Sequence, residues 1–292
     1  MNDFIIYLSL AILGMALGSF SGATVWRLRA RQLQQDKDNG ERVNHEERLR
    51  LNKIINRSFF KDRSKCLHCS YQLEWFDMIP IVSWLALKGR CRECHQKIGY
   101  MEPLLEFGLA AFFVISFAVW PYSLVTIAGL IRLILWLAAG VGLAILFAYD
   151  LKWFLLPNQA NFFVIGIGVL NSLVEIINSH NIGETIFNIF LSVVILSGLY
   201  FALHLMSKGK WIGFGDVKLG FGLGLMLIDW RLSLLALFAA NFIGSVIVLP
   251  GLLMGRLKRS THIPFGPLLI TGFVLAGLFG GYIIAQYFLP LA

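Results

Sequence analysis

The sequence predicts an all-α polytopic membrane protein with about eight transmembrane helices. Its 292 residues are 57% hydrophobic and only 14% charged, and the mean hydropathy is +0.71. A soluble domain has about a quarter of its residues charged. The apolar runs are also long, and roughly 20 residues suffice for a helix to cross a bilayer. The composition therefore excludes an ordinary soluble domain.

Eight apolar runs are candidates for the spanning helices. They cover residues 4–26, 103–121, 123–149, 160–178, 185–206, 217–229, 232–254 and 266–289. The first run is too long for the apolar part of a signal peptide and has no basic segment before it, so we expect a retained helix. The sixth is short and would require little tilt or a locally thinner bilayer. Arg132, inside the third run, should snorkel or pair.

The distribution of charge predicts the orientation. Residues 27–100 carry 16 of the 25 Lys and Arg but 9 of the 17 Asp and Glu, so they hold most of the net charge of +8. Basic loops stay in the cytoplasm, which places the long loop inside and the N-terminus outside. Anionic membrane lipid is the expected partner of this charge, and no nucleic acid is expected, because no basic motif interleaved with aromatic residues accompanies it.

We therefore expect three parts. Residues 1–26 form the first transmembrane helix, residues 27–102 a cytoplasmic basic loop, and residues 103–292 a membrane domain of seven helices. Within the loop, apolar residues at 49, 51, 54 and 55 suit an amphipathic helix on the membrane surface, and a solvated linker is an equal alternative. The stretch 74–85 is too apolar for a free loop and should lie at the headgroup region.

All four cysteines fall in the basic loop, as two C-x2-C pairs. The first C-x2-C motif contains Cys66 and Cys69, and the second contains Cys91 and Cys94, with 21 residues between the two motifs. Two such pairs form the tetrahedral four-thiolate site of zinc ribbons, and a reducing cytoplasm disfavours disulfides. Because four thiolates leave no ligand position open, the predicted zinc is structural. Free or disulfide-bonded cysteines are the alternative.

Two aspartates stand at the ends of apolar runs. Asp150 closes the third run, and Asp216 opens the sixth within the segment 213–218, GFGDVK. A carboxylate at a bilayer edge is costly, roughly 2.5–3.5 kcal/mol on insertion scales, and so marks a candidate functional site. The alternating topology places both on one membrane face. Two facing carboxylates can share a proton and activate water.

The residues around Asp216 suit such a site. Gly213 and Gly215 leave no side chain beside the carboxylate, so that the backbone can bend and a substrate strand can approach closely. Asp216 is expected near a helix N-terminus. Lys218 should face another side, where it sets the depth of the helix or pairs with a substrate carboxylate. The alternative for each aspartate is a helix cap or an interfacial anchor.

These motifs together resemble the type IV prepilin peptidases. Besides the cysteine pairs and the two aspartates, the similar segments are Gly18 to Phe20, Ile79 with Pro80, Ser83 to Leu85, Gly89 to Cys91, Pro103 to Glu106, Leu156 with Pro157, and Ile263 to Pro267. Each segment alone is a weak signal, but their order and spacing are specific. The resemblance extends over most of the chain.

The resemblance implies an aspartic endopeptidase of the bacterial inner membrane. Asp150 and Asp216 would be its catalytic pair. Its substrates would be type IV prepilins or pseudopilins, whose short basic leader is cut after a glycine at the cytoplasmic edge of a hydrophobic helix. The basic loop would not attract such a leader, so we consider the acidic residues Glu102 and Glu106 for leader capture.

The family also methylates the new N-terminus with S-adenosylmethionine. The positions at which this chain departs from the family pattern bear on this methyltransferase activity. Gly22 replaces an asparagine of the N-terminal motif, and Lys152 and Asn158 stand where many members have aspartate. No residues are assigned to this cofactor.

Two other classes remain open. A transporter would use the aspartates as ion sites, although they lie at the edge and no repeat is visible. A membrane scaffold would use the zinc ribbon to bind a partner and leaves the aspartates unexplained. Replacing either aspartate by Asn separates the three classes, because only a protease loses cleavage while it stays folded.

Overall fold

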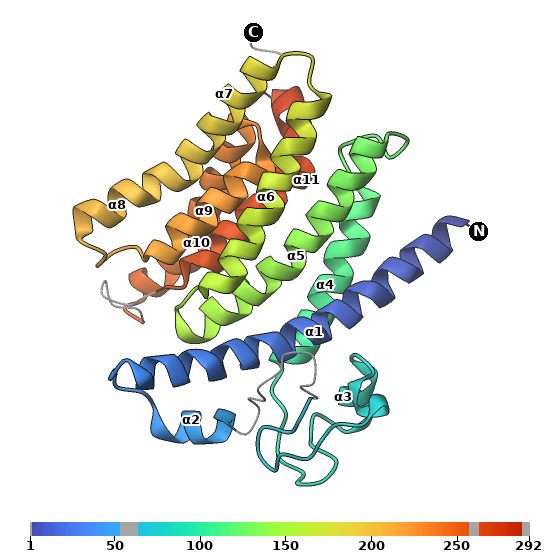
Figure 1. Ribbon diagram of the computed structural model, residues 1–292, viewed down its shortest axis with the longest axis vertical. Helices are drawn as coiled ribbons and strands as arrows, with labels where there is room; N and C mark the ends of the chain where they lie inside the picture. Colours follow the sequence, from blue (N-terminus) through green and yellow to red (C-terminus); the bar gives the residue numbers. More distant parts are fainter. Residues whose placement is uncertain (1, 53–63, 257–262, 288–292) are drawn as a thin grey trace. The chain divides into compact units, whose positions relative to one another are not determined.

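The computed structural model describes residues 2–52, 64–256 and 263–287, and within these ranges the chain is helical, with no named β-strand (Figure 1). The all-α class predicted from composition is confirmed. The contacts divide the chain into two compact units, Met1–Val114 and Ile115–Ala292.

The first unit begins with a helix that is longer than the predicted span. It contains α1 (Asn2–Asp38), α2 (His45–Asn52), the 3-10 helix η2 (Trp75–Met78), α3 (Val82–Ala86) and most of α4 (Met101–Ala118). Helix α1 continues past residue 26 because Ala30 and Leu33 on its polar extension bury against Leu51 of α2. Leu51 is fully buried, so α2 packs on protein. The apolar residues predicted at 54 and 55 lie outside the described residues.

Helices α1 and α4 approach each other closely along a row of glycines. Gly14, Gly18 and Gly22 are spaced by four residues and lie on one face of α1. A Cβ atom at Gly14 would lie 2.7 Å from the Cα of Ala110 on α4, and one at Gly18 would meet the backbone of Glu106. Small residues at this spacing allow such backbone contact between membrane helices.

The second unit is a bundle of packed helices (Figure 1). It contains α5 (Ile127–Trp153), α6 (Asn158–Asn178), α7 (Ile182–Val193), the π-helical segment η3 (Val194–Gly198), α8 (Leu199–Ser207), α9 (Phe214–Leu227), α10 (Trp230–Leu253) and α11 (Phe265–Tyr287). Helix α9 contacts α6, α7, η3, α8, α10 and α11. It is therefore the centre of the bundle.

The π-helical segment explains how α9 is held there. A Cβ atom at Gly220 of α9 would clash with the carbonyl of Leu196 in the π segment, so the two backbones touch. The hydroxyl of Ser197 donates to the carbonyl oxygen of Val217 at 3.0 Å. A π bulge redirects the carbonyls and side chains of one turn, and here these groups face the glycine side of α9.

Seven of the described helical segments are long and apolar enough to cross a membrane, with α7 to α8 counted as one. The remaining predicted span is α9, which has 14 residues and is about 21 Å long, against roughly 30 Å for a hydrocarbon core. The sixth predicted element is short, as expected, but it is not among the seven described segments that are long enough to cross, against the eight spans predicted. Its shortness is compatible with a membrane location because neighbouring helices, not lipid, surround it.

Arg132 pairs, as one of the two predicted alternatives requires. Its guanidinium group lies 2.7 Å from the carboxylate of Glu175 on α6 and 4.1 Å from the ring centre of Tyr122. The side chain is buried, so it does not snorkel.

Candidate active site and metal centre

Asp150 lies in the last turn of α5. The helix ends at Phe154, whose backbone adopts a left-handed conformation with φ of 55° and whose amide donates to the carbonyl oxygen of Asp150. Asp150 is only 5% exposed. Pro157 then starts the turn into α6, so the chain reverses direction just after the carboxylate.

Asp216 lies in the first turn of α9, as predicted. Gly213 is the residue before the helix, with extended backbone angles, and the amide of Asp216 donates to the carbonyl oxygen of Gly213 at 3.2 Å. Asp216 is half-buried. A helix N-terminus has free amide donors and a positive dipole end, which suit a carboxylate.

The segments that carry the two aspartates come together at one end of the bundle. The Oδ2 oxygen of Asp150 accepts a hydrogen bond of 2.9 Å from the amide of Gly266, the second residue of α11. Leu156 links both sides, because its side chain would contact a Cβ atom at Gly266 and another at Gly215. The end of α5 and the starts of α9 and α11 therefore converge on this site.

The two glycines of the GFGDVK segment have different neighbours. A Cβ atom at Gly215 would lie 2.9 Å from the Cβ atom of Leu156, so this position excludes a side chain. A Cβ atom at Gly213 would lie 3.5 Å from the Oδ2 oxygen of Asp216, at ordinary contact distance. Glycine at 213 therefore keeps the space beside the carboxylate open, as the sequence analysis proposed.

Lys218 bridges two helix starts beside the aspartates. Its Nζ nitrogen donates to the Oδ1 oxygen of Asn158 at 2.7 Å, which links the fifth residue of α9 to the first residue of α6. The ammonium group also lies 5.1 Å from the ring centre of Phe214 and 5.5 Å from that of Phe162. Lys218 thus donates to the side-chain amide of Asn158, and position 158 is one where many family members have an aspartate.

Sequence analysis missed three residues of this site. Neither Gly266 nor Leu156 was assigned a role, although both belong to segments that resemble the family. Asn161 was also missed; its Nδ2 nitrogen donates to the carbonyl oxygen of Gly215 at 3.4 Å, and its side chain is completely buried. An asparagine in an apolar run was the available signal.

The acidic residues considered for leader capture are engaged in the first unit. Glu106 is buried and its Oε2 oxygen accepts from the amide of Ile81 at 2.7 Å. The Oε1 oxygen of Glu102 accepts from the indole of Trp26 at 2.8 Å. Both carboxylates accept hydrogen bonds from within the unit, which does not support a role for them in capture of a basic leader.

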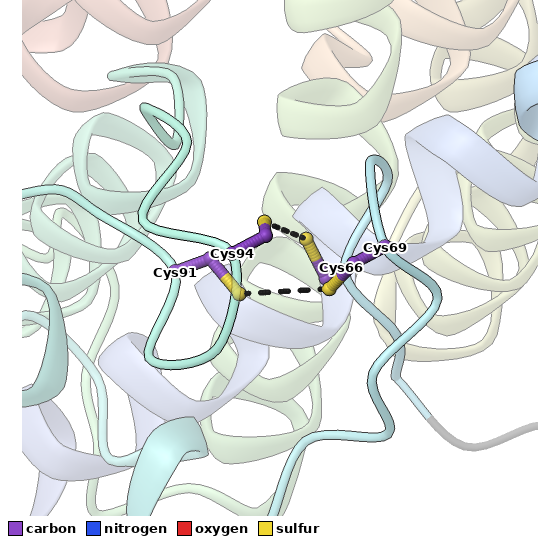
Figure 2. Close-up of side chains that lie close together, drawn as sticks. All are labelled: Cys66, Cys69, Cys91 and Cys94. Atoms are coloured by element: carbon purple, nitrogen blue, oxygen red, sulfur yellow. Dashed lines mark hydrogen bonds between the residues drawn. The ribbon is translucent and has the colours of Figure 1, made fainter.

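The four cysteines form one cluster in the first unit (Figure 2). Cys66 and Cys94 have their sulfur atoms 3.8 Å apart, those of Cys69 and Cys91 are 3.9 Å apart, and all four lie within 4.8 Å of one another. A tetrahedral metal with bonds of about 2.3 Å to sulfur places sulfur atoms about 3.8 Å apart. The cluster has the dimensions of a metal site.

The backbone gives the two cysteine pairs the same shape. The amide of Cys66 donates to the carbonyl oxygen of Tyr71, and that of Cys91 to the carbonyl oxygen of Gln96. The residue after each second cysteine is left-handed, with φ of 64° at Ser70 and 54° at His95. Each pair therefore sits in a tight turn that points both thiols inward.

Three thiols of the cluster differ in how readily they ionise. Burial raises the pKa of the Cys66 thiol to about 12, and the pKa of Cys94 is also raised, while a backbone hydrogen bond to Cys69 lowers the pKa of that thiol. A bound cation reverses this balance because it coordinates thiolates. His68 and His95 are outside the cluster of possible ligands.

The fold and the paired carboxylates together fit the class of membrane-embedded aspartic peptidases. Residues 12–120 match the family model of the bacterial peptidase A24 N-terminal domain, and residues 137–249 match that of the type IV leader peptidase family. With relatives of at least 30% identity that the chain covers over two thirds of their length, the chain belongs to the type IV leader peptidase family.

Similar curated proteins cover most of the chain. The prepilin leader peptidase/N-methyltransferase of Stutzerimonas stutzeri is 28% identical over 98% of this chain and 95% of its own length. The protein of that name from Aeromonas hydrophila is 31% identical over 77% and 74%. A type 4 prepilin-like proteins leader peptide-processing enzyme of Escherichia coli is 29% identical over 89% and 88%. The comparison with solved structures found no match.

Proposed function

We propose that this protein is a membrane aspartic endopeptidase that removes the leader peptide of type IV prepilins or pseudopilins, with Asp150 and Asp216 as its catalytic pair. The observation that supports the proposal is that the end of α5, which carries Asp150, and the starts of α9 and α11 converge around Leu156. The relatives named above support the same activity.

The proposed chemistry needs one protonated and one ionised carboxyl group with a water molecule between them. The ionised group takes a proton from the water while the water oxygen attacks the scissile carbonyl carbon. The protonated group gives its proton to the leaving nitrogen, and the peptide C–N bond breaks. The amide of Gly266 fixes the orientation of the Asp150 carboxylate, which keeps it positioned before the substrate arrives.

The proposed location is the bacterial cytoplasmic membrane, with the N-terminus outside and residues 27–102 in the cytoplasm. The excess of Lys and Arg in that loop supports this orientation. With residues 1–26 as the first helix and 103–292 as the membrane domain, both aspartates lie at the cytoplasmic face. A prepilin in the same membrane presents its leader and its cleavage site at that face.

The four cysteines are proposed to hold a structural zinc ion, since their sulfur atoms fit a tetrahedral cation. A site with four protein thiolates has no position for substrate, so zinc would stabilise the loop rather than act on the peptide. We also propose methylation of the new N-terminus. S-adenosylmethionine, when bound, supplies the methyl group, and the free amine left by cleavage is the acceptor.

The test is cleavage of a prepilin by the purified protein, with labelled S-adenosylmethionine present or absent. Leader loss is read as a mass change and methylation as label on the mature chain. The variants Asp150→Asn and Asp216→Asn should each lose at least about a thousandfold in cleavage rate, because each removes one proton-transfer group. Asp229→Asn is the matched control, since Asp229 caps α10.

Each outcome discriminates between classes. Loss of cleavage in both site variants, with unchanged thermal unfolding and an active Asp229→Asn protein, supports the peptidase. Full activity in either site variant contradicts the assignment of the pair. A wild-type protein that transports ions in vesicles and leaves prepilin intact would instead favour the transporter, and label transfer without leader loss would contradict the order of the two reactions.

A further inference from the structure

The segment between the two cysteine pairs exposes an unusual amount of apolar surface. Residues 74–86, here called the interknuckle segment, contain η2 and α3. Their exposed apolar side chains range from 38% to 70% in exposure and are Trp75, Phe76, Met78, Ile79, Val82 and Leu85. Soluble surfaces rarely collect so many large apolar side chains in one short segment.

The acidic group in η2 is turned away from this surface. The side chain of Asp77 is 2% exposed and lies 2.8 Å from the guanidinium group of Arg92. That guanidinium also lies 4.8 Å from the ring centre of Phe76. The charge of Asp77 is therefore neutralised inside the cysteine-containing part, and the exposed side chains of η2 itself are the apolar Trp75, Phe76 and Met78, with the exposed carboxylate of Glu74 preceding them.

A hydrogen bond to α4 fixes the depth of the interknuckle segment. The amide of Ile81 donates to the buried carboxylate of Glu106 at 2.7 Å. Helix α4 has 18 residues and a length of about 27 Å, close to the roughly 30 Å of the hydrocarbon core. The whole helix is needed to cross, so its first residue lies near the hydrocarbon boundary. Glu106, five residues further, lies about 7 Å deeper.

A second attachment holds the segment at the start of α4. The indole nitrogen of Trp84 donates to the carbonyl oxygen of Gly99 at 3.2 Å, and its ring centre lies 5.4 Å from that of Tyr100. Trp84 is thus directed to the protein. Trp75, in contrast, is 70% exposed. The sequence analysis placed the whole stretch 74–85, which includes both tryptophans, at the headgroup region. In the structure Trp84 is bonded to the protein, whereas the ring of Trp75 is exposed.

We propose that the interknuckle segment is an interfacial membrane anchor, in which Trp75, Val82 and Leu85 insert into the lipid of the leaflet where α4 begins. The occupant of the apolar surface is lipid, because Ile81 reaches the depth of Glu106 inside a spanning helix and because Leu104 and Phe107 near the start of α4 are also exposed apolar side chains. Tryptophan and tyrosine are the residues that favour this region. The anchor holds the cysteine cluster against the bilayer.

The test uses a photo-crosslinking amino acid, benzoylphenylalanine, in the full chain. It replaces Trp75, Val82 or Leu85 one at a time, and Glu93 in the second cysteine turn serves as the exposed polar control. The proteins are illuminated in vesicles of phosphatidylethanolamine and phosphatidylglycerol, and in native membranes, and adducts are identified by mass. We expect lipid adducts at the three test positions in at least tenfold excess over position 93.

Three results would overturn the anchor. They are equal lipid yields at test and control positions, adducts mainly to a second copy of the chain, and adducts in native membranes mainly to another protein such as a prepilin. A second measurement does not depend on the crosslinker. Lipids brominated near the headgroup should quench the tryptophan fluorescence of the wild type more than that of Trp75→Phe. The substitution Trp84→Phe should remove less of the quenchable fluorescence than Trp75→Phe does. Identical quenching of the wild-type and Trp75→Phe proteins contradicts the proposal.

Discussion

The amide of Gly266 donates a hydrogen bond of 2.9 Å to the Oδ2 oxygen of Asp150, 116 residues earlier in the chain. The start of α11 thereby orients a carboxylate at the end of α5. A Cβ atom at Gly266 would lie 2.8 Å from that oxygen and 3.3 Å from the Cδ2 atom of Leu156. Glycine at this position leaves the space of a side chain to the carboxylate.

The substitution Gly266→Ala should therefore lower the cleavage rate strongly while it changes the free energy of unfolding only slightly. The added methyl group pushes the Asp150 carboxylate, and a misplacement of about 1 Å costs roughly ten- to hundredfold in rate. Unfolding free energy should change by less than about 1.5 kcal/mol, because the carboxylate end and the leucine tip can shift. Gly281→Ala on the same helix is the control, since a Cβ atom there meets nothing within 4 Å. Equal activity of the two variants would refute a positioning role.

The glycine row of α1 predicts opposite effects at two neighbouring turns. Gly18→Ala should destabilise the first unit by roughly 1–3 kcal/mol, because its Cβ atom would meet the backbone of Glu106. Gly22→Asn should be tolerated, since a Cβ atom there would lie 3.4 Å from the Cγ atom of Glu102. The Oε2 oxygen of that glutamate is buried without a partner, and an asparagine amide can donate to it, which adds about 1 kcal/mol.

Thermal unfolding of the two variants in one detergent tests this pair. A melting temperature that falls for Gly18→Ala and stays level or rises for Gly22→Asn agrees with the packing. Prepilin methylation by Gly22→Asn is a useful second measurement, because this change restores the residue that is usual in the family. If both variants melt alike, α1 and α4 do not meet along the glycine row.

Much of this fold could be predicted because hydropathy and cysteine spacing are local signals. The apolar runs gave the spanning helices, and two C-x2-C pairs gave a cluster that fits a metal. The aspartates were found because carboxylates at the ends of apolar runs are conspicuous. Their same-end placement followed from counting spans, and the contacts of Leu156 with both Gly215 and Gly266 agree with it.

Other features depend on contacts between distant residues and left no local signal. The polar part of α1 remains helical because Ala30 and Leu33 bury against Leu51, whereas hydropathy alone ends at residue 26. The functions of Glu102 and Glu106 as internal acceptors were not visible, since an acidic residue at a membrane edge fits ligand capture equally well. The sequence does not show whether such a carboxylate accepts a hydrogen bond from the protein or binds a ligand.

The cysteine cluster predicts one bound zinc per chain. Cys66→Ser should remove the metal, and the cysteine-containing loop should lose protection from proteolysis, because the free energy of metal binding contributes to its folding. His68→Ala and His95→Ala should keep the metal, since neither histidine belongs to the cluster. Elemental analysis of the purified proteins measures this. Zinc retained by Cys66→Ser, or absent from the wild type, would be incompatible with a four-thiolate site.

A partly buried ion pair in the second unit gives a prediction about stability alone. Arg132 is 7% exposed and lies 2.7 Å from Glu175. It is 18 residues from Asp150 on the same helix, which is about 27 Å along the axis. A change at this pair should therefore leave the candidate catalytic end of the bundle intact.

Glu175→Gln should destabilise the protein by roughly 2–3 kcal/mol, because it leaves the buried charge of Arg132 without its partner. Combining Arg132→Met with Glu175→Leu should recover most of that loss, since an apolar pair avoids the cost of burying charges. Denaturant unfolding in detergent measures the stability, with Glu184→Gln, an exposed acid at the start of α7, as the control. Cleavage per folded molecule should stay within about twofold of wild type in all three. If the double variant is less stable than Glu175→Gln, the ion pair contributes more than its charges cost to bury.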